Sequence, residues 1–96
     1  MHYSVVLVTM TDPNWVEAYI PAVQALVEKH GGRYLVRAQE IKRVEGQGAN
    51  PSALVVIQWP DEAAANAFYQ DPAYAPYLKS RLAGSKGDFF NAAGLP

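Results

Sequence analysis

The sequence contains no cysteine, and this absence excludes several kinds of functional site. Disulfide bridges, thiolate metal centres and thiol nucleophiles all require cysteine, so none of them is expected. The only two histidines, His2 and His30, form no H-x-x-x-H or H-x-x-E pattern, and we therefore expect no metal. Gly46 and Gly48 make too short a glycine pattern for nucleotide binding, and no other cofactor is expected. No serine lies in a Gly-x-Ser-x-Gly context, so the sequence does not support a serine hydrolase.

The chain also has little charge of either sign. Charged residues make up 18% of it and the net charge is −1, which provides no field to attract nucleic acid or an anionic membrane. No apolar stretch approaches the roughly 18 residues of a membrane span. The amino-terminal residues lack the pattern of a signal peptide, and we expect a cytoplasmic protein. With half of its residues hydrophobic, the chain is expected to form one domain over residues 1–96.

The first half of the sequence predicts a strand, a helix and a second strand. The β-branched run Tyr3–Thr9 indicates a buried strand. Asp12 and Pro13 are typical of a helix start, and the helix should end at Gly31. A second strand is expected from Arg33 to about Val44, either with a bulge near residues 42–43 or as two separate strands.

The second half repeats this order after a turn-rich loop over residues 45–52. The apolar run Ala53–Trp59 predicts the third strand. Asp61 should open one helix, and Asp71 a second helix that ends at Gly84. A last strand is expected at about Gly87–Ala92.

This order predicts an α+β fold of the ferredoxin-like, split βαβ (βαββαβ) type. Its four-stranded antiparallel sheet would carry the helices on one face only. Because the first and third strands are apolar on both faces, the uncovered face should not meet water. We expect a homodimer whose two sheets pack face to face. The alternative is a monomer in which the last segment, or the break between the two later helices, folds over the sheet.

Two arginines in the second predicted strand are the leading candidates for a functional role. Arg33 and Arg37 are four residues apart, so in a regular strand their side chains would share one face with Leu35. Such a face could bind a carboxylate, enolate or phosphate group. Alternatively, the two arginines form structural ion pairs with Glu40, Glu45 or a carboxylate of the partner subunit.

Three other residues are weaker candidates. Trp59 ends the third strand and could line a pocket for an aromatic ligand. Glu45, beside a turn, and His2, at the start of the first strand, are the candidate acid–base groups. For Glu45, the simpler interpretation is a solvated side chain.

The chain resembles the family called domain of unknown function 1330 over nearly its whole length. The resemblance rests on Thr11-Asp12-Pro13, Gly31-Gly32-Arg33-Tyr34-Leu35-Val36-Arg37, Glu45-Gly46, Pro51-Ser52-Ala53-Leu54-Val55-Val56-Ile57-Gln58-Trp59-Pro60 and Ala67-Phe68-Tyr69-Gln70-Asp71-Pro72-Ala73-Tyr74. It implies a ferredoxin-like subunit and a dimeric α/β barrel, but no established activity. The sequence departs from the family pattern at Ala38-Gln39, where members tend to have Gly-Gly, and at Gln58, where they often have Glu. An Arg–Glu contact would become a neutral hydrogen bond here.

Three functional hypotheses follow from these observations. The first is binding of a small anionic or aromatic metabolite between sheet and helices, with Arg33, Arg37, Gln58 and Trp59 lining the pocket. The second is a cofactor-free enzyme, because quinone-forming monooxygenases and lactone isomerases have similar barrels; it would need His2 or Glu45 in the pocket. The third is a structural or assembly protein in which the arginines only hold the dimer together.

Overall fold

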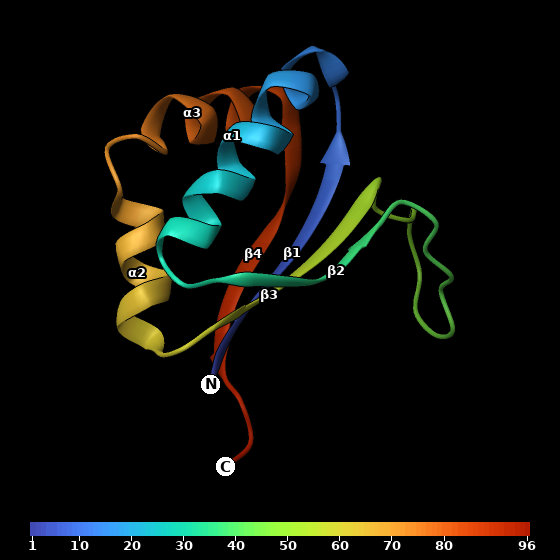
Figure 1. Cartoon of the computed structure of the whole chain (residues 1–96). Helices are drawn as coiled ribbons and strands as arrows, with labels where there is room; N and C mark the ends of the chain where they lie inside the picture. Colours follow the sequence, from blue (N-terminus) through green and yellow to red (C-terminus); the bar gives the residue numbers. More distant parts are fainter.

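The computed structural model describes residues 1–96 as a four-stranded antiparallel sheet with helices on one face (Figure 1). The strands lie in the order β2-β3-β1-β4, which is the ferredoxin-like arrangement that the sequence predicts. The elements along the chain are β1 (His2–Met10), a 3₁₀ turn (Pro13–Trp15), α1 (Val16–Lys29), β2 (Arg33–Ala38), β3 (Ala53–Trp59), α2 (Glu62–Gln70), α3 (Ala75–Gly84) and β4 (Ser85–Ala93).

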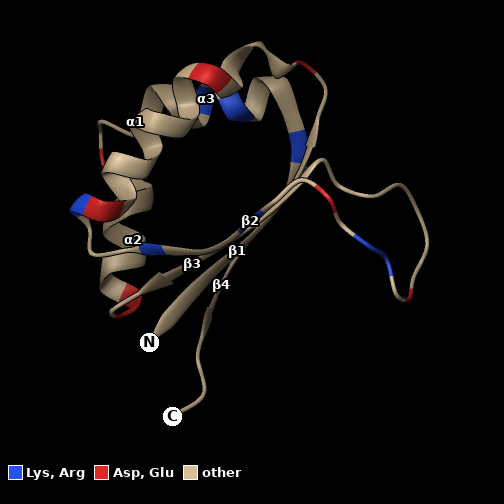
Figure 2. Ribbon diagram, turned by 45° about the vertical axis from the view of Figure 1, so that its right-hand side comes forward, with Lys and Arg blue, Asp and Glu red and all other residues tan.

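The helices form a single layer, so the opposite face of the sheet is bare (Figure 2). Strand alternation places Ser4, Val6 and Val8 of β1 beneath the helices, and all three are buried. The residues between them point to the bare face, where they are only partly buried. None of the helices combines the length and the apolar character needed to cross a membrane.

The core lies where α1 and α2 meet β3. Its largest members are Trp59, Phe68 and Tyr74, each at most 1% exposed. The Phe68 ring lies 5.1 Å from that of Trp59 and 4.5 Å from that of Tyr74, within the usual range for packed aromatic pairs. The break between α2 and α3 therefore has a packing role, because it places Tyr74 in the core.

The two glycines after α1 serve different purposes. Gly31 has a φ of +79°, the left-handed conformation that ends a helix. Gly32 is required by close packing, because a Cβ there would lie 2.6 Å from the Trp59 ring and 2.7 Å from Val27. The helix end and the position of the buried tryptophan are thus fixed together.

The aspartates expected as caps do accept backbone hydrogen bonds. Asp12 accepts from the N–H of Asn14 and begins the 3₁₀ turn before α1, and Asp61 accepts from Ala64 at the start of α2. Asp71 accepts from the N–H of Ala73, which orders the turn that leads into α3.

The prediction for the second strand was wrong in two respects. β2 ends at Ala38, and residues 39–52 form an irregular arm that projects away from the sheet (Figure 1). The bulge lies between Tyr34 and Val36 rather than near residues 42–43. The last strand, by contrast, extends beyond both of its expected ends.

Candidate functional site

The bulge in β2 separates the two arginines that a regular strand would place on one face. Arg33 lies opposite Gln58 and Arg37 lies opposite Val55. Gln58 and Val55 are three residues apart in β3, so their side chains leave opposite faces of the sheet. Residues opposite each other in an antiparallel pair share a face, and Arg33 and Arg37 therefore do not. The same-face prediction was wrong because Leu35 adds one residue to the strand.

Arg33 belongs to the bare face of the sheet. It is exposed, and Gln58 beside it is only partly buried. Gln58 Nε2 donates a hydrogen bond to the Tyr3 hydroxyl at 3.2 Å. The expected Arg–Gln contact does not form, and neither side chain lies beneath the helices.

Arg37 lies on the helix side and is held by two contacts. Its guanidinium carbon is 4.3 Å from the centre of the Tyr34 ring, a cation–π geometry. Its Nη2 donates to Gln24 Oε1 of α1 at 3.2 Å. Neither Arg33 nor Arg37 forms an ion pair with Glu40 or Glu45, so the intrachain pairs considered from the sequence are absent.

A cavity of about 110 Å³ lies between the sheet and helices α1 and α3. Its lining is mostly apolar, with Val6 and Val55 from the sheet and Val16 and Val23 from α1. An apolar cavity with few polar groups is the usual composition of a small-molecule site. Its polar lining residues are Tyr19, Tyr34, Arg37, Gln39, Tyr74 and Arg81.

Arg81 of α3 is the most unusual residue of this cavity. It is 7% exposed, and its Nε and Nη2 atoms have no hydrogen-bond partner. Its guanidinium carbon lies 5.7 Å from the centre of the Phe89 ring. Burial lowers the pKa of Arg81, but the neighbouring Tyr74 and Tyr19 phenols raise it, and the net pKa lies above its usual value. The side chain is therefore a permanent buried cation without a carboxylate partner.

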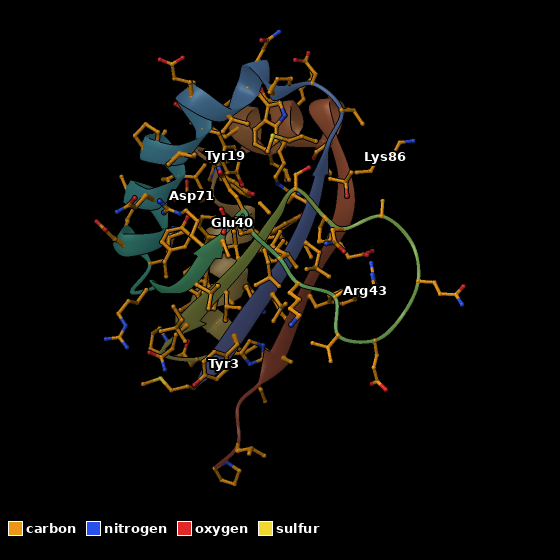
Figure 3. The ribbon with its side chains drawn as sticks, turned by 90° about the vertical axis from the view of Figure 1, so that its right-hand side faces the viewer. Tyr3, Tyr19, Glu40, Arg43, Asp71 and Lys86 are labelled. Carbon is orange, nitrogen blue, oxygen red and sulfur yellow. The ribbon has the colours of Figure 1, made fainter.

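Two tyrosine hydroxyls provide the other polar atoms near Arg81. Tyr19 projects from α1 toward the space between the helices and the sheet (Figure 3). Its hydroxyl lies 2.9 Å from that of Tyr74. Burial, followed by the proximity of Tyr74, raises the pKa of Tyr19 well above its usual range. Tyr19 is thus a neutral hydrogen-bonding group at physiological pH and not a base.

The remaining sequence candidates lie away from this cavity. Trp59 is fully buried, and its Nε1 donates to Ser4 Oγ at 2.8 Å, so it is a core residue and does not line the cavity. Glu45 is exposed in the projecting arm, and His2 is also absent from the cavity wall. Of the four predicted ligand-binding residues, only Arg37 lines the cavity.

Sequence reasoning missed Arg81 although a signal was present. Arg81 lies on the apolar side of its helix together with Tyr74, Tyr77 and Leu78, at the spacing of buried positions. A charged residue in such a stripe needs a partner or a ligand. Its significance became visible only when the fold showed that no acid faces it.

The chain is similar over almost its whole length to one protein family. The family described as domain of unknown function (DUF1330) matches residues 1–95. No curated protein matches the chain significantly.

Several solved structures share the fold at low sequence identity. A protein of unknown function from Rhodopseudomonas palustris, RPA0582, has a TM-score of 0.82 at 19% identity, covering 99% of this chain and 82% of that one. SnoaB, a cofactor-independent oxygenase from Streptomyces nogalater, has a TM-score of 0.67 at 16% identity, covering 99% and 93%. At such identities the likeness concerns the fold alone. The match over residues 1–95 shows that the chain belongs to the DUF1330 family.

Proposed function

We propose that this protein binds a small anionic metabolite in the cavity between its sheet and helices α1 and α3. The observation that carries the proposal is the buried guanidinium of Arg81, which has two nitrogens without hydrogen-bond partners. An unpaired buried charge is costly, and a bound anion would offset this cost. The apolar walls would hold the rest of the ligand.

The proposal keeps the class of ligand expected from the sequence but changes the residues that bind it. Arg81, Tyr19 and Tyr74 replace Arg33, Gln58 and Trp59, and Arg37 remains at the cavity wall. The alternative of a cofactor-free enzyme is less well supported at this cavity. Its two candidate acid–base groups, His2 and Glu45, do not line it.

The proposal is tested by a thermal-shift screen of small carboxylates and phenols against three proteins. These are the wild type, Arg81→Met, and Arg33→Met as the matched control on the bare face. Ligand at about 100 times its Kd adds about 2.7 kcal/mol, which for a domain of this size raises Tm by roughly 10 °C or more. We expect such a rise for the wild type and for Arg33→Met, and none for Arg81→Met.

Two results would contradict the proposal. One is a screen in which no acid raises the Tm of the wild type. The other is a shift that Arg33→Met abolishes and Arg81→Met retains, which would place the binding site on the bare face.

We further propose that two copies of the chain pair through the bare face of the sheet. One row across this face consists of Val36, Val56, Val5 and Phe90, as the strand register shows. Phe90 is 56% exposed and Val36 is 40% exposed in the single chain. A continuous apolar surface of this kind is typical of an interface, and a second copy would cover both faces at once.

A further inference from the structure

The two unpartnered nitrogens of Arg81 lie on the same edge of its guanidinium group. The Nε–H and one N–H of Nη2 point in parallel directions, which is the side-on fork that holds both oxygens of a carboxylate. A ligand with a single charged oxygen would satisfy only one of these donors. The unfilled edge therefore favours a carboxylate over a phenolate or an enolate.

The tyrosine pair supplies one further donor for such a group. Tyr19 and Tyr74 each have one hydroxyl hydrogen, and the bond between them uses only one of the two. The Arg81 guanidinium beside them can only donate to their oxygens, so it does not use the second hydrogen. The remaining O–H can donate to an anion held on Arg81, and it stays protonated because the pKa of Tyr19 is raised.

The volume of the cavity limits the rest of the ligand. A cavity of about 150 Å³ lined by aliphatic and aromatic side chains holds benzene. The cavity here measures about 110 Å³. It therefore matches the size of one ring or a short chain, and a fused ring system would extend beyond it.

The charges at the two ends of the cavity favour a monoanion. Arg37 and Phe89 lie at opposite ends of one row across the sheet, about 14 Å apart at three strand spacings. Arg81, over Phe89, is thus remote from the backbone of Arg37. Arg37 is solvent-exposed and already bonded to Gln24, so it offers little to a second buried negative charge.

From these four observations, and resting on the proposed function, we infer that the natural ligand is a monocarboxylate no larger than one ring. Its two oxygens accept hydrogen bonds from Nε and Nη2 of Arg81, and its apolar part lies against Phe89 and the valines of the sheet. This assigns Arg81 as the ligand-binding residue of the site and makes Tyr19 and Tyr74 secondary donors.

Titration calorimetry at neutral pH with benzoate and hexanoate as probes tests this inference. Benzamide, phthalate and 2-naphthoate respectively test the charge, a second carboxylate and a fused ring. We expect benzoate or hexanoate to bind once per chain, and each of the other three to bind at least about tenfold more weakly. Arg81→Met should lose at least about tenfold in affinity for the bound probe, whereas Arg33→Met should change it by less than about twofold.

Arg81→Lys separates the side-on fork from the charge alone. Lysine keeps the cation but cannot hold two oxygens side by side, so we expect weaker binding than in the wild type. This variant also keeps the test valid if Arg81→Met does not fold. Equal binding by wild type and Arg81→Lys would overturn the side-on geometry.

The other outcomes distinguish this inference from the proposed function. Equal binding of benzamide and benzoate would overturn the carboxylate assignment while leaving a ligand in the cavity. Tight binding of 2-naphthoate through Arg81 would overturn the size limit but not the site. If neither probe binds while other acids raise Tm through Arg81, the monocarboxylate class is wrong and the site is right. If no acid binds in calorimetry and no acid raises the Tm, both proposals are wrong.

Discussion

The charge of Arg81 is largely buried, and no acid balances it. An arrangement of this kind lowers stability, since the desolvation of the cation is not compensated by a carboxylate. Proteins accept such costs at sites that bind or react, because the charge is then available to a ligand. The Tyr74 and Tyr19 phenols outweigh the effect of burial on the pKa of Arg81, but at neutral pH they carry no negative charge that could balance the cation.

Replacing this arginine should therefore stabilise the ligand-free protein. Met has a flexible side chain that can occupy much of the volume of the arginine stem, and it needs no hydrogen bonds. We expect Arg81→Met to increase the free energy of unfolding by about 1–3 kcal/mol, measured by urea denaturation without ligand. A loss of stability of similar size would show that Arg81 is a structural residue, and it would contradict the account.

The hydroxyl of Tyr19 leads to a prediction at alkaline pH. Burial and Tyr74 raise its pKa above the ordinary 10.0, so the folded chain keeps a proton that the unfolded chain loses. The contribution of Tyr19 to the free energy of unfolding should thus be fully present below about pH 10 and should be lost as the pH rises above that value.

Tyr19→Phe tests this origin of the alkaline loss. The variant should lose about 1 kcal/mol at neutral pH, because the hydrogen bond to Tyr74 is gone. Above about pH 10 its stability should fall less steeply than that of the wild type, as measured by urea denaturation across the pH range. If stability falls equally with pH in the two proteins, the alkaline loss does not come from Tyr19.

At the scale of elements, β2 shows why the fold could be predicted and the site could not. Periodicity and the glycine pair locate the strand start at Arg33, because these signals are local. The extra residue at Leu35 depends on pairing with β3 through 34↔57 and 36↔56, a contact that no local pattern contains. One residue of bulge moves every later side chain to the other face, and it therefore reassigns Arg37.

Asp71 connects two elements that are distant in the sequence, and its position is visible in Figure 3. Its Oδ2 lies 2.8 Å from His30 Nε2 and accepts from Lys29 Nζ at 3.1 Å, which ties the end of α1 to the turn before α3. The hydrogen bond from His30, then that from the Ala73 N–H, then that from Lys29, lower the pKa of Asp71 well below its usual value.

The pH dependence of Asp71→Asn follows from the direction of that shift. A lowered pKa means that the contribution to stability is present above the ordinary value of 3.8 and is lost as the pH falls below it. We expect Asp71→Asn to be less stable than the wild type at about pH 5, with the difference shrinking toward about pH 2. Urea denaturation at several pH values measures the stability of both proteins. A difference in stability that is the same at every pH would contradict the role of the carboxylate.

At the scale of the whole molecule, the layered fold is what the sequence predicts best. Two βαβ units of matching order leave few possible topologies. The strands that are apolar on both sides indicate that the sheet face opposite the helices is also apolar. The cavity is harder to predict because its lining comes from strands and helices at both ends of the chain. Arg81 and Tyr19 are 62 positions apart in the sequence, and only the packing of α3 against α1 brings them together.

The proposed pairing of two chains predicts the molecular mass in solution and a substitution that should separate the two chains. Sedimentation equilibrium should give twice the 10.5 kDa of the single chain. Val56→Lys, in the centre of the bare face, should yield the single-chain mass, because a buried lysine would lack a partner. Ala63→Lys, on the exposed surface of α2, is the matched control and should remain paired. A wild-type mass of one chain would contradict the pairing.

The most direct test of the central claim, that an anion binds to Arg81 inside the cavity, is nuclear magnetic resonance of the arginine side chains. The Nε–H signal of Arg81 can be assigned as the one missing in Arg81→Met. During a titration with benzoate, the account predicts that this signal shifts and that the Arg33 signal on the bare face does not. An Arg81 signal that stays in place up to saturating benzoate, while signals elsewhere shift, would contradict the account.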